Sequence, residues 1–148
     1  MDGLLQRLQA QGIVLAIVTS NSSVNVREVL GRQNASLIQY YACDAPILGK
    51  RVKLRKVLHN SGVFHSEAIF IGDEIRDLHA AHAVEIAFGA VSWGVNSPES
   101  LSRHCPEEIF SSIDEIVERV TGPRLETLPK YGILPDSDVY FKGQGALL

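Results

Sequence analysis

The sequence predicts an α/β protein in which helices alternate with the strands of a parallel sheet. Two apolar runs, at residues 13–18 and 68–71, stop at small or acidic residues and pass at once into helix-forming sequence. A short apolar run that ends in this way is typical of a buried strand that leads into a helix. Strands that alternate with helices imply parallel pairing through right-handed crossovers.

Each expected element rests on a local pattern. The first helix carries a leucine stripe and stops at Gly12, and the second begins at Ser23, a favoured N-cap residue. The third has Leu54, Val57 and Leu58 at i, i+3 and i+4, which forms an apolar stripe. The expected helices span residues 2–11, 23–33, 50–61, 75–83, 98–104 and 112–121. The expected strands span residues 13–19, 37–43, 67–72, 86–92 and 108–111.

One core domain and a tail are expected. Gly122-Pro123 marks the boundary, because this pair interrupts regular structure. Residues 1–121 form the predicted core, and residues 122–148, with spaced prolines and glycines, form an irregular tail.

Composition excludes several classes of function. The chain has 148 residues, of which 45% are hydrophobic and 21% charged, which fits one globular domain with a real core. A net charge of -3 and a pI near 5.9 give no support to binding of nucleic acid or an acidic membrane. No apolar run reaches the length of a membrane span, and no signal-peptide pattern is present. Cys43 and Cys105 form no Cys-x-x-Cys pair, so we expect a cytoplasmic protein.

A candidate metal site follows the strand at 67–72. Gly72-Asp73 lies on the turn after that strand, and Asp77 follows one helical turn later. In open α/β sheets the ligand crevice lies at the carboxyl ends of the strands, and carboxylates there suit Mg²⁺. The alternative is that Asp73 only caps a helix and Asp77 lies in solvent.

A candidate anion site follows the strand at 13–19. Thr19, Ser20 and Asn21 place hydroxyl and amide groups between the strand end and the next helix. Exposed N–H groups ahead of a helix N-terminus bind anions. An ordinary capped helix after a buried strand is the alternative.

Lys50 stands at the start of the helix over 50–61, where a cation opposes the helix dipole. That cost is reasonable if Lys50 faces a phosphate or a carboxylate. The other cations of this helix are interpreted as a solvated basic face: Arg51, Lys53, Arg55 and Lys56.

The order of these segments resembles the haloacid dehalogenase-like (HAD) phosphatase superfamily, in particular its phosphoglycolate phosphatase-like branch. Thr19 matches the second motif of the family and Lys50 the third. Gly72, Asp73 and Asp77 match the fourth. The resemblance implies a Rossmann-like parallel core.

The resemblance also assigns phosphate-binding roles. Thr19 and Lys50 would be catalytic: Thr19, with Ser20 and Asn21, binds phosphoryl oxygens, and Lys50 neutralises charge on the phosphate and the nucleophile. The implied substrate is a small phosphorylated metabolite.

The implied cofactor is Mg²⁺, held by Asp73. Gly72 and Asp77 support the site, with Asp77 expected to orient Lys50 or a metal-bound water. Glu74 is a weaker second candidate at the metal.

The first motif of the family has no counterpart in residues 4–120, over which the resemblance extends. In the family this motif is a central strand ending in Asp-x-Asp-Gly-Thr, whose first aspartate attacks phosphorus. A cap domain that largely sets specificity normally follows it. The strands that end at Thr19 and Gly72 must therefore pair directly, leave a gap or recruit a substitute, because unpaired backbone groups inside a sheet are costly.

The tail holds one internal substitute. Apolar residues at 131–134 are followed by Asp136-Ser137-Asp138, which resembles a displaced first motif. However, Pro135 removes a backbone donor, and Val139-Tyr140 stand in place of Gly-Thr. Asp-Ser-Asp is also common in turns, which is the favoured interpretation.

The main hypothesis is a Mg²⁺-dependent phosphatase core that is inactive alone, because it lacks the attacking aspartate. A second hypothesis is a non-catalytic phosphate-binding remnant, or a subunit completed by a chain that supplies the missing strand. A third is that the sequence is truncated and belongs to a longer protein.

Overall fold

A computed structural model describes residues 3–44, 49–122 and 141–144. The sheet has six strands in the order β2-β1-β6-β3-β4-β5, and every neighbouring pair is parallel. The strands are β1 (Val14–Val18), β2 (Tyr40–Ala42), β3 (Ala68–Gly72), β4 (Ala87–Val91), β5 (Glu108–Phe110) and β6 (Phe141–Gln144). The α/β class and the parallel sheet predicted from the sequence are confirmed.

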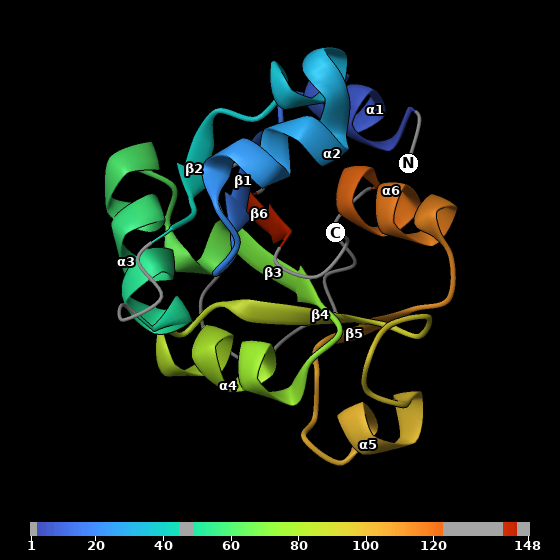
Figure 1. Cartoon of the computed structure of the whole chain (residues 1–148). Helices are drawn as coiled ribbons and strands as arrows, with labels where there is room; N and C mark the ends of the chain where they lie inside the picture. Colours follow the sequence, from blue (N-terminus) through green and yellow to red (C-terminus); the bar gives the residue numbers. More distant parts are fainter. Residues whose placement is uncertain (1–2, 45–48, 123–140, 145–148) are drawn as a thin grey trace.

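Helices cover both faces of the sheet (Figure 1). They are α1 (Leu4–Ala10), α2 (Ser23–Ala35), α3 (Lys50–Ser61), α4 (Ile75–Ala83), α5 (Pro98–Ser102) and α6 (Ile113–Thr121), with a 3-10 turn at His65–Glu67. Within the described residues, no helix is long and apolar enough to cross a bilayer. The cytoplasmic location stays a prediction.

Alternating side chains of the strands divide the core into two clusters. Leu15 and Ile17 of β1 pack with α1, α2 and α6, whereas Ala16 and Val18 pack with α3, α4 and α5. This alternation follows from the two-residue period of a strand. Both faces of β1 are therefore buried, which explains why its sequence is continuously apolar.

The centre of the sheet is occupied by β6. It pairs with β1 through Val14↔Phe141 and with β3 through Ala68↔Phe141, so of the three alternatives the structure shows a substitute strand between them. The expectation of a wholly irregular tail is thus wrong for 141–144. The physical reason is that the facing edges of β1 and β3 offer backbone groups that a third strand can pair.

The internal candidate for the first motif is not this strand. Asp136-Ser137-Asp138 and the apolar residues before it lie outside the described residues. Asp136 and Asp138 precede β6 in the sequence. In the family that the sequence resembles, the attacking carboxylate follows the central strand. The remaining tail and the division of the chain at residue 121 stay predictions.

Candidate active site

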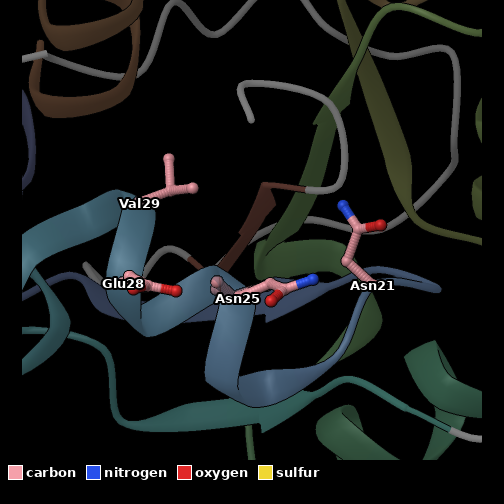
Figure 2. A pocket seen from close by; sticks show the side chains of 5 residues that line it. Asn21, Asn25, Glu28 and Val29 are labelled. Carbon is pink, nitrogen blue, oxygen red and sulfur yellow. The ribbon is translucent and has the colours of Figure 1, made fainter.

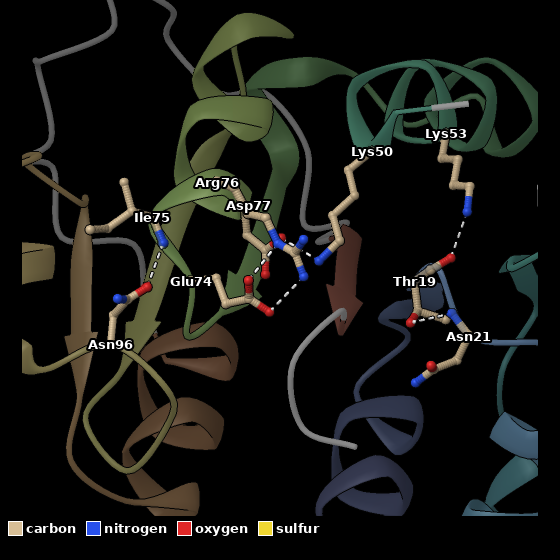
Figure 3. Close-up of polar contacts among 9 residues, drawn as sticks. All are labelled: Thr19, Asn21, Lys50, Lys53, Glu74, Ile75, Arg76, Asp77 and Asn96. Atoms are coloured by element: carbon tan, nitrogen blue, oxygen red, sulfur yellow. Dashed lines mark hydrogen bonds and ion pairs between the residues drawn. The ribbon is translucent and has the colours of Figure 1, made fainter. Parts of the chain in front are cut away.

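Asp73 directly follows β3 and is held by the loop after β4. Its Oδ2 accepts a hydrogen bond from Val95 N at 2.6 Å, and its carbonyl accepts one from Asn96 N at 3.1 Å. Asn96 Oδ1 also accepts a hydrogen bond from Ile75 N at 3.0 Å (Figure 3). The loop lies so close that a Cβ on Gly94 would be 1.9 Å from Asp73 Cβ. The buried Asp73 carboxylate is therefore positioned by the fold, before any ligand binds.

Lys50 and Asp77 form an ion pair between the start of α3 and the first turn of α4. Lys50 Nζ donates to Asp77 Oδ1, and the two side chains are 14% and 0% exposed. The other oxygen, Oδ2, has no hydrogen-bond partner within the described residues. A Cβ at position 72 would lie 3.0 Å from this oxygen, so the absence of a side chain at Gly72 makes space for the Asp77 carboxylate. Burial raises the pKa of Asp77 above its ordinary value, and hydrogen bonding and attraction from Lys50 oppose that rise.

Three carboxylates gather at the end of β3. One oxygen each from Asp73, Glu74 and Asp77 lies within 4.8 Å of the other two. The buried and unpaired Asp77 Oδ2 indicates that this cluster is short of positive charge or donors. A hard cation with oxygen ligands fits that need. Glu74 is also paired with the exposed Arg76, so it is the least available of the three.

Thr19 follows β1 and begins a loop that is tied to the end of β2. Thr19 N donates to Ala42 O at 3.2 Å, and Thr19 Oγ1 accepts from Asn21 N at 3.1 Å. The N-cap of α2 is Ser22, whose side chain accepts from Asn25 N, so the expected cap at Ser23 is off by one residue.

Lys53 is buried, which corrects its assignment to a solvated face. Its Nζ donates to Thr19 O at 2.7 Å. Arg51, Arg55 and Lys56 are exposed as expected. The pattern held a signal for this difference, since Lys53 precedes Leu54 on the buried stripe of α3. A lysine next to a core position can direct its stem inward.

The predicted residues lie along one edge of the sheet. Thr19 follows β1, Asp73 follows β3, and both strands are parallel to β6 between them. Lys50 joins this edge through Asp77 (Figure 3). The catalytic and binding roles of these residues stay predictions. Lys53 and residues 94–96 were not among the predicted site residues, and only their contacts identify them.

A shallow hollow lies beside the Thr19 loop, on the first turns of α2 (Figure 2). Its volume is about 260 Å³, and Asn21 is the only predicted site residue that lines it. The hollow is lined by Asn21, Asn25, Val26, Glu28 and Val29. It lies beside the predicted site and does not enclose Lys50 or Asp73.

Comparison with known proteins identifies the same family that the sequence motifs resemble. A family model described as haloacid dehalogenase-like hydrolase matches residues 1–91. A phosphoglycolate phosphatase of Synechococcus elongatus is 34% identical over 119 residues, which are 80% of this chain and 56% of that protein. A phosphoglycolate phosphatase of Escherichia coli is 25% identical over 130 residues, which are 82% of this chain and 50% of that protein. The chain thus spans about half the length of the curated relatives it matches.

Solved structures share the fold. A haloacid dehalogenase-like family hydrolase from Streptococcus pneumoniae has a TM-score of 0.69 at 21% identity, covering 77% of this chain and 55% of that one. A predicted phosphatase from Clostridium acetobutylicum has a TM-score of 0.72 at 22% identity, covering 80% and 57%. At this level of identity the likeness concerns the fold alone.

Proposed function

Because the chain belongs to the haloacid dehalogenase-like hydrolase family, we propose that it is the phosphate- and metal-binding core of a phosphomonoester hydrolase. One observation carries the proposal: the Asp73, Glu74 and Asp77 carboxylates cluster within 4.8 Å of one another beside Lys50. A cation and an anion bound at this edge would each meet groups of opposite charge.

Each residue then has a defined task. Thr19, with Ser20 and Asn21, donates hydrogen bonds to phosphoryl oxygens, and Lys50 neutralises their charge. Asp77 holds the Lys50 ammonium in place. Asp73 is the main metal ligand, with Glu74 as a weaker one. Bound Mg²⁺ supplies additional charge stabilisation for the phosphoryl group.

We further propose that residues 1–148 alone are inactive. The central strand β6 reads Phe141-Lys142-Gly143-Gln144 and carries no carboxylate. Positioning and neutralisation without an attacking group leave the covalent route closed. The phosphoglycolate phosphatase names of the two relatives make a small phosphorylated metabolite the favoured ligand class.

A metal titration tests the site. Calorimetry should show weak Mg²⁺ binding that Asp73→Asn reduces further, since Asp73 is the proposed main ligand and Asp77 is engaged by Lys50. Asp114→Asn, on the exposed first turn of α6, is the matched control and should leave binding unchanged. Tight binding, or binding that Asp73→Asn leaves intact, contradicts the proposed metal site.

An assay with p-nitrophenyl phosphate in Mg²⁺ buffer tests the inactivity. We expect no turnover by residues 1–148. Asp2-Gly3 is the other candidate for part of a first motif, but in the sequence Asp2 precedes a helix and does not follow a strand. If turnover occurs and Asp136→Asn abolishes it while Asp2→Asn does not, the nucleophile resides in the tail. Turnover that survives Asp136→Asn would show that this account of the chemistry is wrong.

The second candidate is a subunit completed by another chain, whose strand would take the place of β6 at the centre of the sheet. Within the described part of the chain, β6 covers four residues and pairs with β1 through three residue pairs. An added strand would bind through the same kind of main-chain hydrogen bonds that β6 makes with β1 and β3. A peptide with apolar residues followed by Asp-x-Asp-Gly-Thr should then restore turnover, and the same peptide with both aspartates replaced by asparagine should not.

A further inference from the structure

Lys53 is a buried cation without an ion-pair partner within the described residues. Its Nζ donates to two backbone carbonyls, Thr19 O at 2.7 Å and Asp44 O at 2.5 Å, and the residue is 5% exposed. Burial is the largest cause of a lowered pKa at Lys53. Burying an ammonium between neutral acceptors costs free energy that an apolar side chain would not. Stability alone therefore does not account for a lysine at this position.

The acceptor carbonyl of Thr19 belongs to the same peptide group as Ser20 N–H. A trans peptide is planar, so its C=O and N–H point in opposite directions. Figure 3 shows the Thr19 carbonyl turned toward Lys53 and the hydroxyl turned away from it. The bond from Lys53 thus fixes the direction of the Ser20 N–H, which points away from α3.

Ser20 N–H has no acceptor within the described residues. Ser20 itself is exposed, and it lies two residues before the Ser22 cap of α2. A free N–H between a strand end and a helix N-terminus is a donor that an anion can use. If the peptide group turned over, the Thr19 carbonyl would present its negative end to that anion.

Asp44 gives the same arrangement a second anchor. Its backbone has a φ of 57°, in the left-handed region that Asp adopts more readily than most residues other than glycine. Asp44 N donates to Asn21 O at 3.0 Å, and Asp44 O accepts from Lys53. Lys53 therefore bridges the loop after β1 and the loop after β2 through the carbonyls of Thr19 and Asp44.

We propose that Lys53 is a positioning residue of the phosphate site, which keeps the Ser20 N–H directed at the bound anion. The proposal rests on the phosphate-binding function proposed above and adds a residue outside the predicted motifs. The two lysines of α3 then have different roles. Lys50 forms an ion pair with Asp77, near the end of β3, and Lys53 orders the loop at the end of β1.

The test is a titration of ¹⁵N-labelled residues 1–148 with inorganic phosphate in Mg²⁺ buffer. In the wild type, the Ser20 amide resonance should shift on binding. Lys53→Met keeps the length of the side chain but removes the charge and the donors. It should weaken phosphate binding about tenfold, because one oriented hydrogen bond to a charged ligand is lost, and it should abolish the Ser20 shift.

Two variants separate positioning from packing. Lys53→Arg retains donors for both carbonyls and should restore the Ser20 shift. Lys56→Met, an exposed lysine of the same helix, should leave both the shift and the affinity unchanged. The Asp73 amide reports on the intact fold of the other half of the site and should keep its resonance in all variants.

The outcomes are distinct for the two proposals. If phosphate binds to the wild type but moves no Ser20 resonance, or if Lys53→Met binds phosphate as well as the wild type does, the role of Lys53 is refuted and the phosphate site stands. If phosphate shifts no resonance of Thr19, Ser20 or Lys50 in the wild type, the proposed function fails, and the role of Lys53 fails with it.

Discussion

The two strands at the centre of the sheet, β3 and β6, are neighbours with opposite kinds of sequence. β3 reads Ala-Ile-Phe-Ile-Gly, is mostly buried, and leads directly to Asp73. β6 reads Phe-Lys-Gly-Gln and lies in the same sheet between β1 and β3. The position of β3 is specified by its side chains, whereas β6 satisfies the backbone groups of its two neighbours. Backbone pairing with two neighbours is therefore enough to fill a central place in a sheet.

The largest effect should come from the side chains of β3. Phe70 is fully buried and packs edge-on against Phe88. Phe70→Ala should lower the free energy of unfolding by about 3–5 kcal/mol, because it removes a large apolar group and leaves a cavity. Urea denaturation measures the change. Phe64→Ala, at a residue that is 72% exposed, is the control and should cost less than about 0.5 kcal/mol.

A smaller effect should come from the backbone of β6. Gly143 pairs with Ala16 on one side and with Phe70 on the other. Gly143→Pro removes an N–H from this ladder and should cost about 1–3 kcal/mol in the same denaturation experiment.

Lys142→Ala is the matched control for that variant. It leaves every backbone donor of β6 in place and should therefore lower the free energy of unfolding less than Gly143→Pro does. If Gly143→Pro lowered the free energy of unfolding no more than Lys142→Ala does, β6 would not pair at the centre of the sheet in solution. The contrast between β3 and β6 would then be wrong.

The smallest effect should come from Asp77, behind the end of β3. Its pKa is raised in the folded protein above the ordinary value of 3.8, with burial as the main cause. The folded state therefore favours the protonated form of Asp77. The contribution of the protonated carboxyl to the free energy of unfolding is fully present below pH 3.8, and it is lost as the pH rises through the folded-state pKa. Asp77→Asn mimics the protonated form and should raise stability at neutral pH.

Denaturation of Asp77→Asn and wild type at several pH values measures that difference. The gain should shrink as the pH falls toward 3.8. A variant that is less stable than the wild type at neutral pH would show that the ion pair with Lys50 outweighs the burial of the carboxylate. In either case Asp77→Asn should weaken Mg²⁺ binding, since the site loses a charge.

Local patterns predicted most of the fold. The helix expected at 50–61 matches α3, and the strand expected at 67–72 starts one residue later as β3. The strand expected near 37–43 is reduced to Tyr40–Ala42, and of the residues before it Gln39 still hydrogen-bonds Leu15 of β1. Boundaries of this kind depend on which residues find a partner, and the local pattern holds no information on the partner.

The sequence by itself determined the alternation of strands and helices, the placement of Thr19, Lys50 and Asp73 near strand ends or helix starts, and the family. These features depend on short-range periodicity and on spacing, which are local properties of the chain. The tertiary structure alone decided that β6 enters the centre of the sheet, that Lys53 turns inward to Thr19, and that Val95 and Asn96 hold Asp73. Each of these depends on backbone groups or side chains that are distant in sequence and meet only when the sheet has assembled. A local pattern cannot encode which distant carbonyl or N–H a side chain will find, and that is the physical reason for the division.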